Sequence, residues 1–128
     1  MGTENNKIKN FTDLKAWGEA HALALSIYKS TKQFPSSEQF GLTNQMRRAS
    51  VSVGSNIAEG FGRQTKKEKN QFYFHAKGSL LELKSQLMLA RDLDYLSSES
   101  SVSILESANR AHVLLEGLIK SSFDRQRN

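Results

Sequence analysis

The residues of this 128-residue chain that could support enzyme chemistry are few. Tyr28 and Lys32 form a Tyr-x-x-x-Lys pair, but the glycine-rich strand-turn-helix unit of a dinucleotide-binding enzyme does not accompany it. No Gly-x-Ser-x-Gly pattern surrounds Ser50, Ser52 or Ser55. The spacing therefore predicts neither hydride transfer nor a nucleophilic serine.

The histidines do not form a metal-binding pattern either. His21, His75 and His112 fall on three different predicted helices, and the chain has no Glu-x-x-His or His-x-x-x-His motif. His21 and His112 lie in or beside apolar stripes, which is typical of core or interface histidines. The chain has no cysteine, so thiol catalysis, thiolate metal sites and disulfides are excluded. We predict a protein that is not an enzyme and has no cofactor or metal.

The stretch RRASVSVGSNIAEGFGR, residues 47–63, is compatible at first sight with a strand, a phosphate-binding loop or a tightly packed helix. Its Gly-Phe-Gly end lacks the third glycine and the Lys-Ser/Thr pair of a phosphate loop. Its alternation of polar and β-branched residues stops by Ile57. At 100° per residue, one face instead collects an apolar stripe: Leu42, Met46, Ala49, Val53, Ile57 and Gly60. The pattern predicts a helix that ends at Gly60 to Gly62.

The opposite face of that helix is polar and includes Arg48, Asn56, Glu59 and Arg63. Three interpretations of this face remain open at this point. It is a solvated surface, or it forms a subunit interface or an internal polar network through residues such as Asn56 and Glu59, or it contributes to a ligand site.

Three further segments show helical periodicity, at about residues 12–31, 65–96 and 98–123. Short breaks separate the four segments, so consecutive helices should pack antiparallel. We predict an all-α fold, an up-down-up-down antiparallel four-helix bundle over residues 11–125, with a flexible N-terminal tail at 1–10 and a C-terminal tail at 126–128. The chain shows no export signal and no apolar run that could span a membrane, so we expect a cytoplasmic protein.

The helix predicted at 65–96 carries two apolar lines. The first has the spacing of a bundle seam: Ala76, Leu80, Leu83, Leu87 and Ala90. The second repeats every seven residues on another side: Phe74, Leu81, Met88 and Tyr95. One core needs only one line, so the second line packs against another helix of the chain or against another subunit.

Basic residues are concentrated in one part of the sequence. Residues 45–69 contain six basic and two acidic residues, and so carry most of the formal net charge of +5. The candidate phosphate contacts are Arg47, Arg48, Arg63, Lys66, Lys67 and Lys69, with Lys77 and Lys84 further along the next helix. Such residues would bind RNA or DNA largely without sequence preference, but solvated lysines at a helix start are also common.

The string QMRRASVSVGSNIAEGFGR, with DLKAWGEAHALALSIYKSTKQFP before it and FHAKGSLLELKSQLMLARDLDYL after it, resembles the bacterial 23S ribosomal RNA intervening-sequence family. The segment Asn56 to Gly60 and the Arg47 and Arg48 pair are the specific signals. The resemblance implies a four-helix bundle that assembles into ring-like homopentamers. The family is also similar to the accessory protein of diversity-generating retroelements, a basic pentamer that associates with a reverse transcriptase and binds nucleic acid.

The leading interpretation is a non-enzymatic oligomer, a homopentamer, that presents basic residues to RNA or DNA. The alternative is a protein-protein interaction scaffold that does not bind nucleic acid. In both cases we expect the chain to bind further copies of itself, and we expect no contact with a membrane.

Overall fold

The computed structural model describes residues 8–127, and the side chains of residues 8–121. Its elements are two short 3-10 helices and four long helices: η1 (Phe11–Asp13), α2 (Lys15–Thr31), η2 (Ser36–Glu38), α3 (Leu42–Phe61), α4 (Lys66–Asp92) and α5 (Ser98–Arg127). The described residues contain no strand. The predicted all-α class is therefore confirmed.

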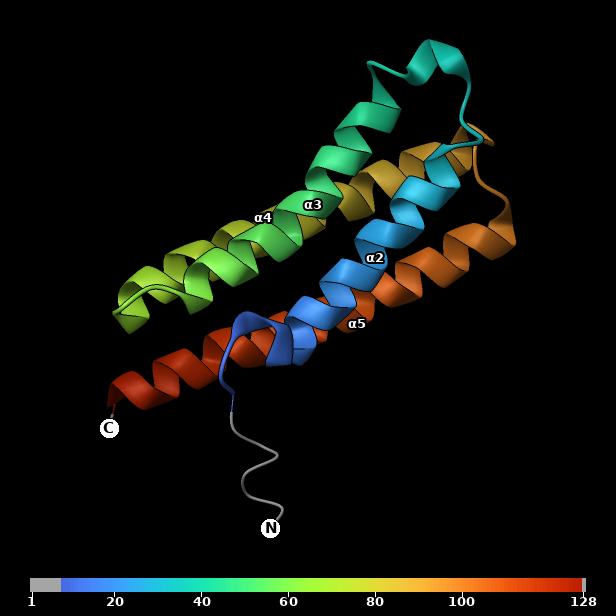
Figure 1. Ribbon diagram of the computed structural model, residues 1–128. Helices are drawn as coiled ribbons and strands as arrows, with labels where there is room; N and C mark the ends of the chain where they lie inside the picture. The colour runs from blue at the N-terminus through green and yellow to red at the C-terminus, as the bar shows by residue number, and fades with distance from the viewer. Residues whose placement is uncertain (1–7, 128) are drawn as a thin grey trace.

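The four long helices form two layers (Figure 1). The α2 and α3 helices lie toward the viewer, and α4 and α5 lie behind them. Each long helix packs against two others, α2 and α4 each contacting both α3 and α5. Short links join successive helices, so the chain runs up and down in turn, which confirms the antiparallel four-helix bundle. The α5 helix continues to Arg127, two residues past the expected end of the domain.

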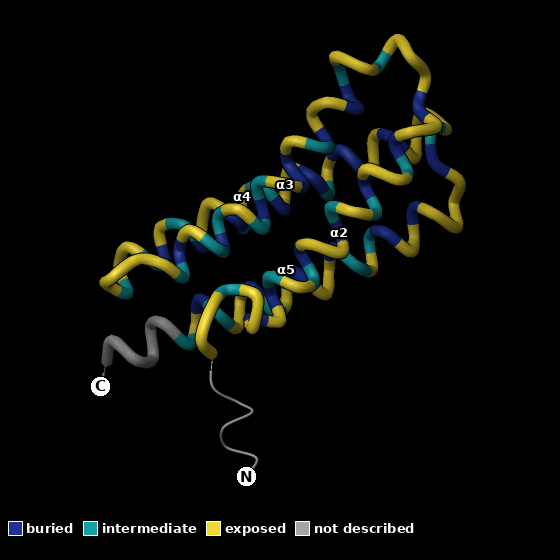
Figure 2. Tube along the Cα trace, viewed as in Figure 1, coloured by how far each residue is buried: buried dark blue, intermediate teal, exposed yellow. Residues whose placement is uncertain are grey.

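Buried residues follow the inner side of each helix (Figure 2). All five residues of the first apolar line of α4 have no exposed surface: Ala76, Leu80, Leu83, Leu87 and Ala90. On α3, Met46 and Val53 are also fully buried and Ile57 is 1% exposed. The periodicity therefore placed the core faces of these two helices correctly, because packing between near-parallel helices requires one apolar residue per turn.

The end of α3 packs closely on α4 at Gly60. A Cβ atom at this position would lie 2.7 Å from Cε1 of Tyr73 and 3.0 Å from the carbonyl oxygen of Lys69. Gly62 then ends the helix, and the Thr65 side chain accepts a hydrogen bond from the backbone N–H of Glu68 at the start of α4. The glycine-rich stretch is a close helix crossing followed by a turn.

The first long helix also has two apolar lines, only one of which is in the core. Ala20, Leu23 and Ile27 have no exposed surface. Trp17 and His21 instead lie beside this line on the side that faces α3. The N-terminal approach to the helix is fixed by Asn10, whose side chain caps η1. Residues 1–7 of the predicted N-terminal tail, and Asn128, lie outside the described residues.

Candidate functional site

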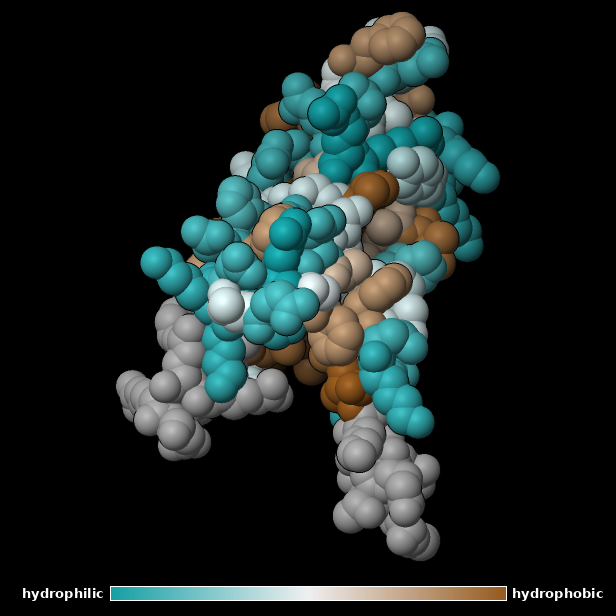
Figure 3. Space-filling model, turned by 60° about the vertical axis from the view of Figure 1, so that its left-hand side comes forward, coloured by the Kyte–Doolittle hydropathy of each residue, from teal (hydrophilic) through white to brown (hydrophobic). Residues whose placement is uncertain are grey.

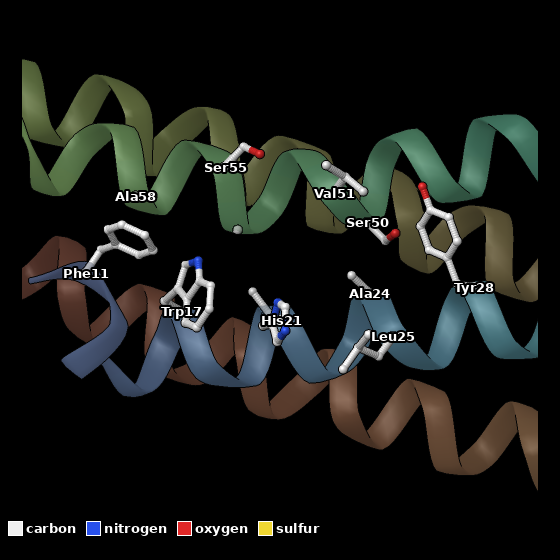
Figure 4. Close-up of a pocket in the computed structure, with 12 residues that line it drawn as sticks. Phe11, Trp17, His21, Ala24, Leu25, Tyr28, Ser50, Val51, Ser55 and Ala58 are labelled. Atoms are coloured by element: carbon white, nitrogen blue, oxygen red, sulfur yellow. The ribbon is translucent and has the colours of Figure 1, made fainter.

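An open groove of about 550 Å³ lies between α2 and α3 (Figure 4). The α2 side contributes mainly aromatic and aliphatic side chains, and the α3 side contributes small ones. Its lining is Phe11, Trp17, Ala20, His21, Ala24, Leu25, Tyr28, Ser50, Val51, Gly54, Ser55 and Ala58. Leu25 is 60% exposed and Val51 45% exposed, so the groove presents apolar surface to solvent.

Three aromatic rings along the groove pack against one another. The rings of Trp17 and His21 are stacked, with centroids 4.7 Å apart and planes 15° apart. The ring of Phe11 meets Trp17 edge-on at 5.3 Å. Facing them, a Cβ on Gly54 would lie 3.6 Å from Nε1 of Trp17, so α3 passes close to the indole. Trp17 and His21 are one turn apart on α2, and with Phe11 of η1 they form one wall of the groove (Figure 4).

Arg47 lies over the ring of Tyr28 at the C-terminal end of α2. Its Nε donates a hydrogen bond to Oγ1 of Thr31 at 2.9 Å, and its Nη2 donates to the carbonyl oxygen of Tyr28 at 3.4 Å. Its guanidinium carbon also lies 4.7 Å from the centroid of the Tyr28 ring. Arg47 therefore joins two helices of the chain and covers the carbonyl end of α2, where a cation is favoured.

The second apolar line of α4 divides into two parts. Phe74, Leu81 and Met88 are 46%, 47% and 45% exposed and form a stripe on the outside of the bundle. Tyr95 does not continue this stripe. Its ring packs on Phe34 at 5.2 Å, and its hydroxyl donates to Glu38 at 2.9 Å. We call Phe74, Leu81 and Met88 the α4 stripe.

The basic residues predicted from one sequence segment occupy two separate places. Arg47 and Arg48 lie in the first half of α3, about 20 Å along the helix from its C-terminal end. Arg48 is exposed beside Glu82 and Ser79. The remaining four lie at the turn between α3 and α4: Arg63, Lys66, Lys67 and Lys69. A segment that is contiguous in sequence therefore gives two basic surfaces in space.

Two of the four residues at the α3–α4 turn also make contacts within the chain. Arg63 forms an ion pair with Glu59 at 2.8 Å and lies over the ring of Phe72. Nζ of Lys69 donates to the carbonyl oxygen of Phe61 at 2.6 Å, which stabilises the C-terminal end of α3. Lys66 is half-buried and Lys67 is exposed. The turn is basic, and Arg63 and Lys67 are its exposed cations.

The two further candidates, Lys77 and Lys84, are turned toward α5. Nζ of Lys77 lies 2.8 Å from a Glu116 carboxylate oxygen, and this ion pair lowers the pKa of Glu116. Nζ of Lys84 lies 2.7 Å from Nδ1 of His112, and burial lowers the pKa of Lys84. Nε2 of His112 lies 3.4 Å from Glu116. These four side chains form a polar seam between α4 and α5.

Asn56 and Glu59, whose environment the sequence did not decide, have different surroundings. Nδ2 of Asn56 donates to the backbone oxygen of Ser52 at 2.9 Å, and the hydroxyl of Ser52 lies 2.8 Å from that of Ser79 on α4. Glu59 is exposed beside Arg63. Asn56 thus borders the contact between α3 and α4, and Glu59 faces outward.

The groove between α2 and α3 was not anticipated from the sequence. Its signal in the sequence is the second apolar line of α2, which includes Trp17, His21 and Tyr28. Apolar patches reach the surface between hydrophilic ones (Figure 3). Within residues 8–127 no cluster of three acidic or histidine side chains could hold a metal ion, and no helix is long and apolar enough to cross a membrane.

These features define a four-helix bundle that exposes apolar side chains between α2 and α3 and along α4. The family model of the 23S rRNA-intervening sequence protein matches residues 12–117, and the chain belongs to this family. The resemblance drawn from the residues 56–60 motif is thereby confirmed.

A solved structure supports the same fold. A crystal structure of a protein of unknown function from the S23 ribosomal protein family of Bacteroides thetaiotaomicron VPI-5482 superposes with a TM-score of 0.74. The two chains are 23% identical, and the match covers 82% of this chain and 98% of the other. No curated protein matches the sequence.

Proposed function

We propose that this protein is a non-enzymatic homopentamer that binds RNA or DNA through the basic turn between α3 and α4. The observation that carries the proposal is the position of Arg63, Lys66 and Lys67 around the N-terminus of a 27-residue helix. The N-terminal end of a helix carries a partial positive charge, which adds to the attraction of these side chains for phosphate. Contacts of this kind are sensitive to salt and largely independent of sequence.

Self-association strengthens such weak contacts. The α4 stripe and the groove between α2 and α3 both expose apolar surface, which is typical of subunit contacts. In a ring whose axis runs along the bundle, every α3–α4 turn lies at the same end. Several basic turns at one end raise the effective affinity for a single nucleic acid strand. The resemblance to the family supports five as the number of copies.

Titrations of a labelled single-stranded RNA and a DNA duplex, followed by fluorescence anisotropy at about 50 and 200 mM salt, test the proposal. The triple variant Arg63→Gln, Lys66→Gln and Lys67→Gln should bind at least about tenfold more weakly and with a shallower salt dependence. Lys32→Gln is the control, because Lys32 is exposed near the other end of the bundle. Absence of binding at low salt, or an equal loss in the control, would contradict the proposal.

A protein-binding scaffold is the second candidate function. The observation that favours it is the groove between α2 and α3, which has the form of a site for an apolar side chain or helix. Affinity purification from the native host separates the two functions. A scaffold should retain a specific protein after nuclease treatment, whereas a partner held through RNA or DNA should be lost.

A further inference from the structure

We propose that the groove between α2 and α3 of one copy receives the α4 stripe of the next copy, so that the chain assembles head to tail. This inference rests on the self-association in the proposed function and specifies the two surfaces that meet. It concerns the groove, to which the sequence assigned no role, and it is independent of nucleic-acid binding.

The two surfaces have complementary shapes. The groove is concave, with large rings along α2 and the small residues Gly54, Ser55 and Ala58 along α3. The α4 stripe is a convex row on a single helix. From Trp17 to Tyr28 the groove is about 16 Å long, and from Phe74 to Met88 the stripe is about 21 Å long, at 1.5 Å per helical residue. A helical ridge of this length covers the whole groove.

The two surfaces lie on opposite layers of the bundle, so one copy cannot fill its own groove. The groove lies between α2 and α3, the front layer in Figure 1. Leu83 is fully buried in the core. Leu81 is two residues earlier, about 200° around the helix, and therefore faces away from the core. The stripe adjoins the residues that face α5, Lys77 and Lys84, and thus belongs to the back layer. Different surfaces on opposite layers give a heterologous contact, which closes into a ring when the rotation between copies divides a full turn and otherwise gives an open filament.

Charge favours one direction of docking. Rotation about an axis along the bundle keeps α4 of one copy parallel to α2 of the next, because α2 and α4 run in the same direction within the chain. Asp92, at the Met88 end of the stripe, then lies toward the Lys29 end of the groove. Asp92 is paired with Arg91, but Asp94 leaves this end of the stripe with a net negative charge, so opposite charges meet where it approaches Lys29.

Gly78 leaves room for a close neighbour at the stripe, although Gly18 on α2 and Gly117 on α5 are equally open. Gly78 lies inside α4 between Phe74 and Leu81, and a Cβ at this position would meet nothing within 4 Å in its own chain. Glycine inside a helix costs about 1 kcal/mol relative to alanine, and nothing in this copy requires it there. A second helix that approaches the stripe closely would account for the glycine, because the missing Cβ allows the close approach.

The absence of cysteine from the chain allows a direct test by cross-linking. The full chain carrying Val51→Cys in the groove and Leu81→Cys in the stripe is treated with a short bismaleimide. We expect covalent products that extend beyond the dimer, because each copy joins two neighbours. Phe40→Cys with Leu81→Cys is the matched control, since Phe40 is 88% exposed in the link before α3, away from both surfaces. Dimers from Leu81→Cys alone would instead show that two stripes meet, and would overturn the proposal.

Complementation gives a second test. Val51→Glu disables the groove and Leu81→Glu disables the stripe, and each variant alone should have the mass of a monomer by light scattering. Mixed in equal amounts, they should form a dimer through the one intact groove and the one intact stripe. Circular dichroism checks that both variants remain folded, which is expected because both side chains are about half exposed.

The outcomes distinguish this inference from the proposed function. If the wild-type protein has the mass of a monomer at micromolar concentration, both self-association and the docking of stripe into groove are wrong. If the wild type is an oligomer but the Val51 and Leu81 pair does not cross-link and the mixed variants remain monomers, only the docking arrangement is wrong.

Discussion

Arg47 and Thr31 join α3 to the end of α2 through a hydrogen bond of 2.9 Å from Nε to Oγ1. The Thr31 hydroxyl in turn donates to the carbonyl oxygen of Ile27 at 2.7 Å and is buried. A guanidinium that is held on one side by a buried hydroxyl and on another by the Tyr28 ring has fewer donors left for phosphate. Arg47 therefore has a structural role that its neighbour in sequence, Arg48, does not share.

Arg47→Ala should lower the free energy of unfolding by about 1–2 kcal/mol, because it removes a charge-assisted hydrogen bond and leaves the Thr31 oxygen without its donor. Urea unfolding followed by circular dichroism measures the change. Arg48→Ala is the control, since Arg48 is exposed, and its unfolding free energy should change by less than about 0.5 kcal/mol. Equal effects of the two substitutions would show that the contact with Thr31 contributes nothing.

Gly60→Ala should destabilise the bundle by about 1–3 kcal/mol, because its Cβ would overlap the Tyr73 ring and the backbone oxygen of Lys69. Gly117→Ala is the matched control on α5. A Cβ at position 117 meets nothing within 4 Å, so the better helix propensity of alanine should raise stability by about 0.5–1 kcal/mol. Thermal unfolding should thus shift in opposite directions for the two variants. A shift in the same direction would mean that α3 and α4 do not cross closely at Gly60.

Glu38 should make the end of the bundle sensitive to acid. A hydrogen bond from the backbone N–H of Leu42, together with one from the Tyr95 hydroxyl, lowers the pKa of Glu38 below its ordinary value of 4.5. A carboxyl whose pKa is lower in the folded state contributes stability above pH 4.5 and loses that contribution as the pH falls through the folded-state pKa. Glu38→Gln should therefore reduce the dependence of the unfolding free energy on pH below about pH 5.

Tyr95→Phe isolates one of the two hydrogen bonds to Glu38. This variant should show part of the change in pH dependence seen with Glu38→Gln, because the hydrogen bond from Leu42 remains. The pKa of Tyr95 is raised, first by its hydrogen bond to Glu38, so ionisation of the phenol in alkali should become easier in Glu38→Gln. An unchanged phenol titration in that variant would contradict the contact.

Trp17 should report the docking of stripe into groove. It is the only tryptophan in the chain, so the protein's tryptophan emission comes from one wall of the groove. If a second copy covers this wall, the emission should shift to shorter wavelength as the protein concentration rises. Leu81→Glu should abolish this shift, whereas Phe40→Glu should retain it. A shift that persists in Leu81→Glu would mean that another surface covers Trp17.

The helices and most of their core faces could be predicted from the sequence. The seam from Ala76 to Ala90 is fully buried as expected, because the side-chain direction in a helix follows from residue spacing alone. The interpretation of RRASVSVGSNIAEGFGR as a helix also holds, since its apolar residues keep the helical period past Gly54 and up to Gly60. The role of Gly60 is visible only in the tertiary structure, because the ring of Tyr73 that excludes a Cβ comes from the next helix.

Periodicity by itself determined which residues could share a helix face, and the tertiary structure decided what each face meets. Tyr95 has the seven-residue spacing of Phe74, Leu81 and Met88, yet it contacts Phe34 and Glu38 because α4 ends at Asp92. Arg47 and Lys69 belong to one basic segment of the sequence, yet each stabilises the carbonyl end of a different helix. Contacts across helices depend on how the elements cross, and local spacing carries no information about those distances.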